Sequence, residues 1–403
     1  MSLSRSAQQA RATPVVSAEP PVWLPAFSAI VLGQLLSAAT FASVIPFLPL
    51  FLRELGQDEQ GAAAWTGAIS GIAAAIQLVA IPVWGAIGDR IGRKLMVQRA
   101  MLTAAATFAL LTAAVAPWQL LALRAVQGAA AAPNASLLAL AAAALPPTRV
   151  SAGMGLMQTA QFLGLSIGPL LGGLAAASFG FRGAFLAAAA AAIATTVAVQ
   201  LFVRESRPAR RASAAPSVGA SVTLVLRSAR MRPSILAMLA HQTAYTLGWV
   251  LLPLQLATTD ARAVAWVLAA NALGVAVGAT ALGWLDGRVG GRVVGVSALG
   301  AAAVLAIPQA FTSDPSVLTG LRLGFGVCVG GVLPSLRAAL AESAEDKTQL
   351  GVLYGVAQSA VAGGGVIGAP LAALIAAQWG LSAVHIAGAL VFAATVLGLA
   401  RKT

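Results

Sequence analysis

The chain has 403 residues, of which 59% are hydrophobic and 9% are charged, whereas a soluble protein carries about 25% charged residues. Such a composition excludes a water-soluble globule and indicates an integral membrane protein. The net charge of +13 would suggest nucleic-acid binding in a soluble protein, but the positions of the charges argue against it.

The apolar runs predict twelve membrane-spanning helices. They lack the ten-residue alternation of a membrane β-barrel, and helices are the other way to pair every backbone group in hydrocarbon. An even number of spans puts both ends of the chain on one side. The expected spans are 24–52, 62–86, 95–115, 117–141, 151–178, 181–203, 232–257, 262–285, 291–310, 314–341, 347–378 and 381–400.

The positive charges indicate which side faces the cytoplasm. With these spans, three basic residues lie on one side (Arg53, Arg182 and Arg262) and two lie inside the membrane (Arg124 and Arg322). The other 20 of the 25 Lys and Arg residues lie on the opposite side, which is the bias of a cytoplasmic face. We therefore expect both termini in the cytoplasm.

Two segments outside the spans are polar. Residues 1–21 have no apolar core, so we expect a disordered cytoplasmic tail rather than a signal peptide. Residues 204–231 are rich in Arg, Pro and Ser and predict a basic cytoplasmic linker. This linker would separate an N-terminal six-helix half, 22–203, from a C-terminal half, 232–403.

The two halves repeat each other. Gln158, Gly164, Gly168 and Gly180 return 200 residues later as Gln358, Gly364, Gly368 and Gly380, and Arg124-x-x-x-Gly128 returns 198 residues later as Arg322-x-x-x-Gly326. Two similar halves around a site near the middle of the membrane are typical of transporters that work by alternating access.

Three motifs lie in the first half. The connection between the second and third spans is a predicted loop of about eight residues, too short for anything but a tight hairpin. Its second-half counterpart around Asp286 is degenerate, because Asp286 falls one residue early. The hairpin contains Gly85, Asp89, Arg90, Gly92, Arg93 and Lys94.

The second motif is Leu120-x-x-x-Arg124-x-x-Gln127-Gly128 in the fourth span. A charge inside the membrane is costly, so Arg124 is a functional candidate; a structural arginine that binds carbonyls is the alternative. Pro133 follows Arg124 by nine residues, whereas Pro334 follows Arg322 by twelve. We therefore expect the end of the fourth helix to differ from its counterpart.

The third motif, in the fifth span, is made of small residues and a proline. Small residues four apart let helices approach closely, and a proline bends a helix. The motif comprises Gly164, Gly168, Pro169, Gly172 and Gly173.

Together the three motifs resemble those of the major facilitator superfamily, specifically its twelve-helix drug:proton antiporter branch, over residues 24–400. The resemblance implies an all-α membrane protein with two pseudo-symmetric six-helix halves. It implies that the charged hairpin is a cytoplasmic gate, that Arg124 takes part in proton transfer, and that the glycine motif marks an exporter. For the hairpin, the alternative is that its charges only fix topology.

The proton site stays open at this stage. All twelve carboxylates lie in tails, loops or helix ends, whereas many antiporters of cationic drugs carry a central acid. Asp89 and His241 are the candidate carriers beside Arg124. His241 lies about 14 Å into the seventh span at 1.5 Å per residue, and histidine titrates near neutral pH; a purely structural histidine is the alternative.

Polar, aromatic and methionine side chains at mid-helix depth predict the substrate cavity, with adaptable apolar walls and uncharged hydrogen-bonding groups. Many of them could instead only bridge helices. They are Gln34, Phe41, Met154, Met157, Gln158, Gln161, Phe162, His241, Gln242, Tyr245, Trp249, Asn271, Tyr354 and Gln358.

The sequence thus predicts a multi-pass inner-membrane exporter of small amphipathic, drug-like compounds, driven by protons, monomeric and associated with antibiotic resistance. We expect no nucleic acid, cofactor or metal as a partner, since Cys328 is alone and His241 and His385 are far apart. The alternatives are an exporter or flippase of one metabolite, siderophore or lipid and, from another class, a membrane-embedded enzyme.

Overall fold

The computed structural model describes residues 23–130, 133–146, 149–203, 228, 231–256, 260–342 and 350–400. The predicted tail 1–21 and almost all of the predicted linker 204–231 lie outside these residues. The first half contains α1 (Leu24–Val44), η1 (Ile45–Phe47), α2 (Leu48–Glu54), α3 (Glu59–Ile91), α4 (Arg93–Leu111), α5 (Pro117–Ala129), α6 (Pro133–Ala144) and α7 (Val150–Phe202). The second half contains α9 (Arg232–Val250), α10 (Leu252–Gln255), α11 (Ala261–Val289), α12 (Gly291–Gln309), α13 (Pro315–Glu342), α14 (Leu350–Trp379) and α15 (Leu381–Ala400).

The predicted twelve spans correspond to these helices. Within the described residues, ten helices are long and apolar enough to cross a membrane. One of them, α7, is two segments that meet at Gly180, whose φ of 71° and ψ of 173° are not helical. The helices α5 and α6, of 13 and 12 residues, are each too short to cross a bilayer core of about 30 Å and together form the fourth span.

Glycines at equivalent positions turn the chain between consecutive helices. Gly92 (φ 113°) separates α3 from α4, and Gly290 (φ 96°) separates α11 from α12. Gly180 and Gly380 (φ 81°) play the same part later in each half. Because only glycine adopts such φ values at little cost, these turns confirm the repeat at offsets of 198 and 200 residues.

The charged connection is shorter than predicted. We expected a loop of about eight residues, but α3 continues to Ile91 and α4 begins at Arg93, and this prediction was wrong. The left-handed conformation of Gly92 reverses the chain within one residue, so no longer loop is needed. Asp89 and Arg90 therefore lie in the last turn of α3, and Arg93 and Lys94 in the first turn of α4.

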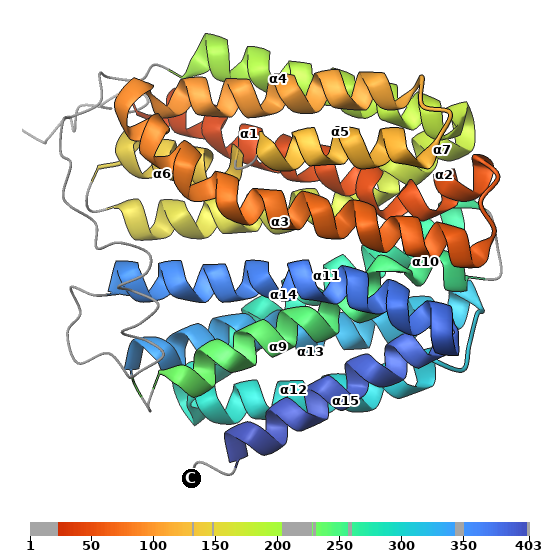
Figure 1. Cartoon of the computed structure of the whole chain (residues 1–403). Helices are drawn as coiled ribbons and strands as arrows, with labels where there is room; N and C mark the ends of the chain where they lie inside the picture. The colour runs from red at the N-terminus through yellow and green to blue at the C-terminus, as the bar shows by residue number, and fades with distance from the viewer. Residues whose placement is uncertain are drawn as a thin grey trace, which may run out of the picture.

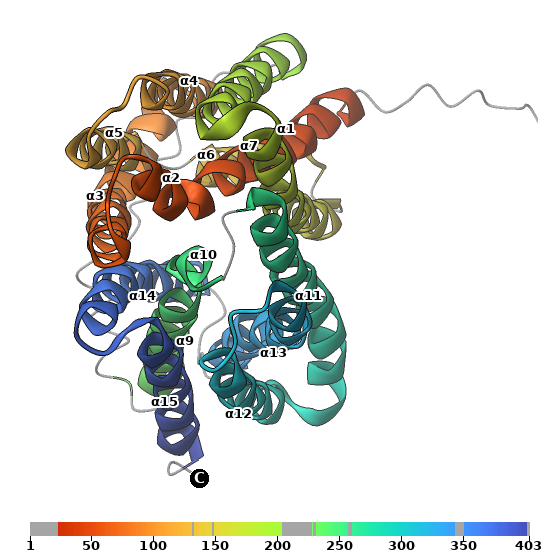
Figure 2. The same ribbon diagram turned by 90° about the vertical axis from the view of Figure 1, so that its right-hand side faces the viewer.

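The two halves form separate bundles (Figure 1). We call the end where α1 begins and α15 ends the terminal face, at the left of Figure 1, and the opposite end the far face, which Figure 2 shows. The main contacts between the halves join α3 to α14 and α7 to α11. Near the far face a core cluster crosses between the halves, from Phe47 and Ala176 to Leu252 and Ala265.

Candidate functional site

The basic residues of the charged turn contact their own half. Arg93 Nη1 donates to the Ala139 carbonyl of α6 (3.0 Å), and Lys94 Nζ donates to the Gln200 carbonyl of α7 (2.9 Å). Arg90 is exposed. The surroundings of Gly85 and the side chain of Asp89 lie outside the described part of the structure.

In the second-half counterpart the acid joins two helices. Both carboxylate oxygens of Asp286, on α11, accept from the Ser335 hydroxyl of α13, at 2.8 and 2.9 Å. Arg288 lies over the Trp284 ring (3.6 Å to its centre). Asp286 therefore ties two helices of one half together at the terminal face.

Arg124 takes part in a buried relay between two helices. Its side chain is 7% exposed, and its Nη1 donates to Gln127 Oε1 (2.6 Å). Gln127 Nε2 in turn donates to Thr107 Oγ1 on α4 (2.6 Å). Arg124 Nε has no acceptor among the described residues. The partners of Arg124 in this relay are neutral. Burying a charge among neutral partners costs free energy, which argues against a purely structural role for Arg124.

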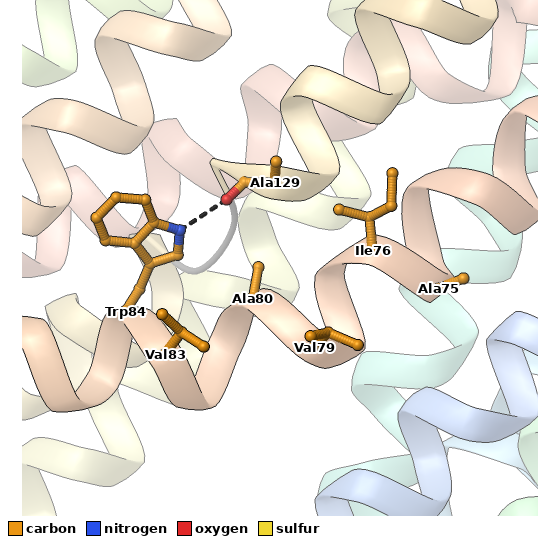
Figure 3. Close-up of a pocket in the computed structure, with 7 residues that line it drawn as sticks. All are labelled: Ala75, Ile76, Val79, Ala80, Val83, Trp84 and Ala129. Atoms are coloured by element: carbon orange, nitrogen blue, oxygen red, sulfur yellow. Dashed lines mark hydrogen bonds between the residues drawn. The ribbon is translucent and has the colours of Figure 1, made fainter.

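The fourth span is interrupted where the proline spacing predicted a difference. α5 ends at Ala129 and α6 begins at Pro133, whereas the equivalent α13 continues through Pro334. Carbonyls at a helix end need outside donors. Trp84 Nε1 donates to the Ala129 carbonyl (2.7 Å), as Figure 3 shows. Arg99 Nη2 donates to the Ala130 carbonyl (2.9 Å).

The interruption borders a pocket on the outer side of α3. Its volume is about 500 Å3, and it is lined by Ala75, Ile76, Val79, Ala80, Val83, Trp84 and Ala129 (Figure 3). The Arg99 guanidinium lies 3.5 Å from the centre of the Trp84 ring. Sequence reasoning missed Trp84 and Arg99, and the displaced Pro133 was the only signal of this site.

The glycines of the fifth span allow very close helix contacts. A Cβ at Gly168 would lie 2.7 Å from the Ala39 carbonyl oxygen of α1, and one at Gly173 would lie 2.6 Å from the Ala261 carbonyl oxygen of α11. The motif therefore packs α7 against α1 in its own half and against α11 in the other half. Pro169 lies inside the helix between these contacts.

The second half contains a buried polar network around the end of α9. Arg322, on α13, is fully buried, and its Nη2 donates to the Gly248 carbonyl of α9. A Cβ at Gly248 would lie 3.4 Å from His385 Nδ1 and 3.8 Å from Arg322 Nη2, so both groups approach this glycine. His385 Nε2 donates to Gln255 Oε1, and Gln255 Nε2 donates to the carbonyls of Gln309 and Thr312.

Three predicted cavity residues lie in the packed interior of the second half. His241 is 3% exposed and stacks on Tyr245 and packs beside Phe392, with ring centres 6.5 and 5.8 Å apart. Asn271 Nδ2 donates to the Tyr245 hydroxyl (2.9 Å). The Tyr245 ring also stacks on Phe325.

The other predicted cavity residues divide by exposure. Buried ones are Gln34, which donates to Asn134 Oδ1 (2.7 Å), and Met157. The side chain of Tyr354 lies outside the described part of the structure. The remaining residues are partly or fully exposed: Phe41, Met154, Gln158, Gln161, Phe162, Gln242, Trp249 and Gln358.

Gln158 and Gln358, related by the repeat, are both exposed on the terminal side of the contacts between the halves. Gln358 Oε1 accepts from Arg337 (3.0 Å). Sequence reasoning missed His385, Gln255 and the contact of Arg322. The repeat of Arg124 at Arg322 was the available signal.

Comparisons with known proteins agree with this architecture. The Major Facilitator Superfamily pattern matches residues 30–258 and 235–402. Multidrug resistance protein MdtG of Serratia proteamaculans is 32% identical over 371 residues, 89% of each chain. MdtG of Yersinia enterocolitica is 31% identical over 371 residues, 89% of this chain and 88% of its own.

Solved transporter structures share the fold at low identity. The nucleoside transporter NupG aligns with a TM-score of 0.74 and 12% identity over 93% of this chain and 98% of its own. The human organic anion transporter MFSD10 aligns with a TM-score of 0.66 and 19% identity over 94% and 100%. With the two pseudo-symmetric halves described above, these matches establish that the chain belongs to the major facilitator superfamily.

Proposed function

We propose that the chain is a secondary active exporter of small amphipathic, drug-like compounds, driven by proton antiport. The observation that carries the proposal is the position of the contacts between the halves. A Cβ at Gly67 of α3 would lie 3.0 Å from the Ala369 carbonyl oxygen of α14, and the contact of Gly173 with Ala261 is closer still, at 2.6 Å. Both contacts lie toward the far face, so the halves can rock about them.

The charges support an orientation with both termini in the cytoplasm of a bacterial inner membrane. The helix ends at the terminal face carry basic residues that include Arg90, Arg149, Arg232 and Arg337. Those at the far face carry Arg53, Arg182 and Arg262. This is the distribution of a cytoplasmic terminal face. In that orientation the contacts between the halves lie on the periplasmic side, and this conformation is inward-facing.

The division into halves at 22–203 and 232–403, joined by a linker at 204–231, remains our proposal, as does a monomeric state. The family membership and the multidrug resistance name of the relatives favour drug export. An exporter or flippase of one metabolite, siderophore or lipid is the second candidate. A membrane-embedded enzyme is disfavoured, because the superfamily consists of transporters.

The test is transport by the purified chain in proteoliposomes, with an imposed pH gradient and a panel of amphipathic compounds. Uptake of several unrelated compounds that follows the pH gradient is the expected result. Uptake of a single compound class would favour a dedicated exporter. Transport that ignores the gradient would remove the antiport claim.

A further inference from the structure

We infer that the transported compounds carry an anionic group, such as a carboxylate, and that Arg322 binds it. This inference rests on the proposed export function and names its substrate class. Sequence reasoning left substrate charge open, since no carboxylate lies at mid-helix depth. The fixed charges at that depth are positive: Arg124 and Arg322.

Arg322 is a buried charge, and some of its hydrogen-bond donors have no acceptor among the described residues. Its side chain is 0% exposed. One N–H group donates to the Gly248 carbonyl, whereas Nε and Nη1 have no acceptor among the described residues. Burying a guanidinium is expensive unless a carboxylate or several acceptors compensate it. An arrangement that leaves two donor atoms open is suited to a ligand that brings its own acceptor oxygens.

Among the described residues of the second half, the acids are placed where they cannot fill that role. Asp260 and Asp314 cap the starts of α11 and α13, and Asp286 accepts from Ser335 at the terminal face. Asp314 precedes Arg322 by eight residues, about 12 Å along the chain direction at 1.5 Å per residue, and Glu342 follows it by twenty, about 30 Å. Within the part of the chain that the structure describes, Arg322 therefore has no acid partner, and a mobile anion can compensate its charge.

Aromatic rings lie beside this guanidinium. The Arg322 guanidinium lies 5.4 Å from the centre of the Phe325 ring, and the Phe325 ring stacks on that of Tyr245. Aromatic faces and a cation together favour an anion with an aromatic or aliphatic body. A neutral compound gains only from the rings.

The break between α9 and α10 gives this site a route to the substrate path. α9 ends at Val250, two residues after Gly248, and α10 follows Leu251. α10 also contacts α2 of the first half at the far face. Separation of the halves at this face would move α10, and the carbonyl and guanidinium groups at the end of α9 would become accessible.

A capping role for Arg322 explains only part of its contacts. Arginine near a helix C-terminus satisfies free carbonyls, and the bond to Gly248 does this. Capping leaves Nε and Nη1 unused, and an anion or a buried water could bind them. A water would be displaced equally by neutral and anionic compounds, so matched ligands separate the two cases.

The experiment uses the full chain in detergent and in proteoliposomes with three dansyl probes of similar length. They are dansyl-aminohexanoate, its methyl ester and dansylcadaverine, which are anionic, neutral and cationic. We expect wild-type protein to bind the carboxylate about 10- to 100-fold more tightly than the ester, the range for a hydrogen bond to a charged group. We expect the amine to bind more weakly than the ester.

Arg322→Gln should reduce carboxylate affinity to the level of the ester, so that the preference between the two probes disappears. Arg322→Lys should keep part of the preference, because it keeps the charge. Arg262→Gln removes an exposed cation of the same half and should leave the preference intact. Should Arg322→Gln not fold, benzoate, benzyl alcohol and benzylamine can instead compete with the ester for the wild-type protein. We expect the anion to compete best and the cation to compete least.

The outcomes distinguish a failure of the anion site from a failure of the proposed export function. Equal wild-type affinity for the carboxylate and the ester, or an intact preference in a folded Arg322→Gln protein, overturns the anion site while export stands. A wild-type protein that transports none of the probes or the wider panel overturns both.

Discussion

Arg124 and Arg322 hold equivalent positions in the two halves, yet their guanidinium groups have different kinds of partner. Each lies four residues before a glycine that packs closely on another helix, Gly128 on α3 and Gly326 on α11. Arg124 donates to a side chain of its own helix, whereas Arg322 donates to the backbone of α9.

This difference suits the two arginines to different roles. The relay of Arg124 is made of side-chain groups, which can exchange partners during transport by changing rotamer. A bond to the carbonyl at the end of α9 instead fixes the helix whose continuation, α10, meets the first half. We therefore propose that the first half carries coupling and the second half carries substrate recognition.

Arg124→Ala should abolish gradient-driven transport, and Arg124→Lys should restore it only in part, since lysine keeps the charge but loses the planar set of donors. Gln127→Leu should impair transport as well, because it removes the acceptor and breaks the relay to Thr107. Uptake in proteoliposomes is the measurement, with Arg182→Gln, at an exposed arginine, as control. Full activity of Arg124→Ala would leave the residue with no coupling role.

Asp89→Asn should lower transport by about tenfold, the effect of losing one charge-assisted contact in one of two states, while the protein expresses and folds normally. The control is Glu59→Gln, which removes an exposed acid at the opposite end of the same helix. Uptake normalised to the amount of protein in the vesicles measures the change. Wild-type rates for Asp89→Asn would contradict the gate assignment.

Gly168→Leu should destabilise the protein by about 1–3 kcal/mol or more, the range for an overpacked core, and abolish transport. The added side chain would collide with the Ala39 carbonyl and with Ala42 of α1. Gly155→Ala lies on the same helix with no neighbour within 4 Å of the added Cβ, and should be tolerated. Thermal unfolding in detergent compares the two; similar melting temperatures would mean that α1 and α7 do not pack this way.

The interrupted fourth span gives a separate test. Trp84→Phe keeps an aromatic ring but removes the donor to the Ala129 carbonyl, and should cost about 1 kcal/mol of stability. Trp118→Phe, at an exposed tryptophan, should cost much less. Melting temperatures in the same detergent measure both, and an equal loss would show that the hydrogen bond to Ala129 does not stabilise the break.

Sequence patterns predicted the spans and the repeat because long apolar runs and turn glycines are local signals. For the fourth span the sequence predicted only that it would differ from its second-half counterpart, and not that it would break after Ala129. The donors to the carbonyls at this break, Trp84 and Arg99, come from other helices. The contact of His385 with Gln255 joins residues 130 positions apart and leaves no periodic signal.

It was harder still to predict from the sequence which side chains face the substrate cavity. Lipid is as apolar as the protein interior, so a membrane helix need not show an amphipathic pattern that reveals its inner face. Depth along α9 placed His241 near the middle of the membrane, but depth does not distinguish the substrate path from the packing beside Phe392. Gln158 and Gln358, which the repeat relates, are both exposed, and their place in the substrate cavity stays a prediction.

The last prediction concerns the proton carrier. His241 is buried between aromatic rings, and its Nδ1 has no partner among the described residues. A proton held there would create a buried charge with no nearby counter-charge on those residues, which is unfavourable. We therefore expect His241→Gln to keep the wild-type pH dependence of transport, and Asp89→Asn to lose it while retaining counterflow exchange of substrate. Varying the pH on each side of the same vesicles in turn measures both. Loss of pH dependence in His241→Gln would make this histidine the carrier, and its retention in both variants would favour another ion or facilitated efflux.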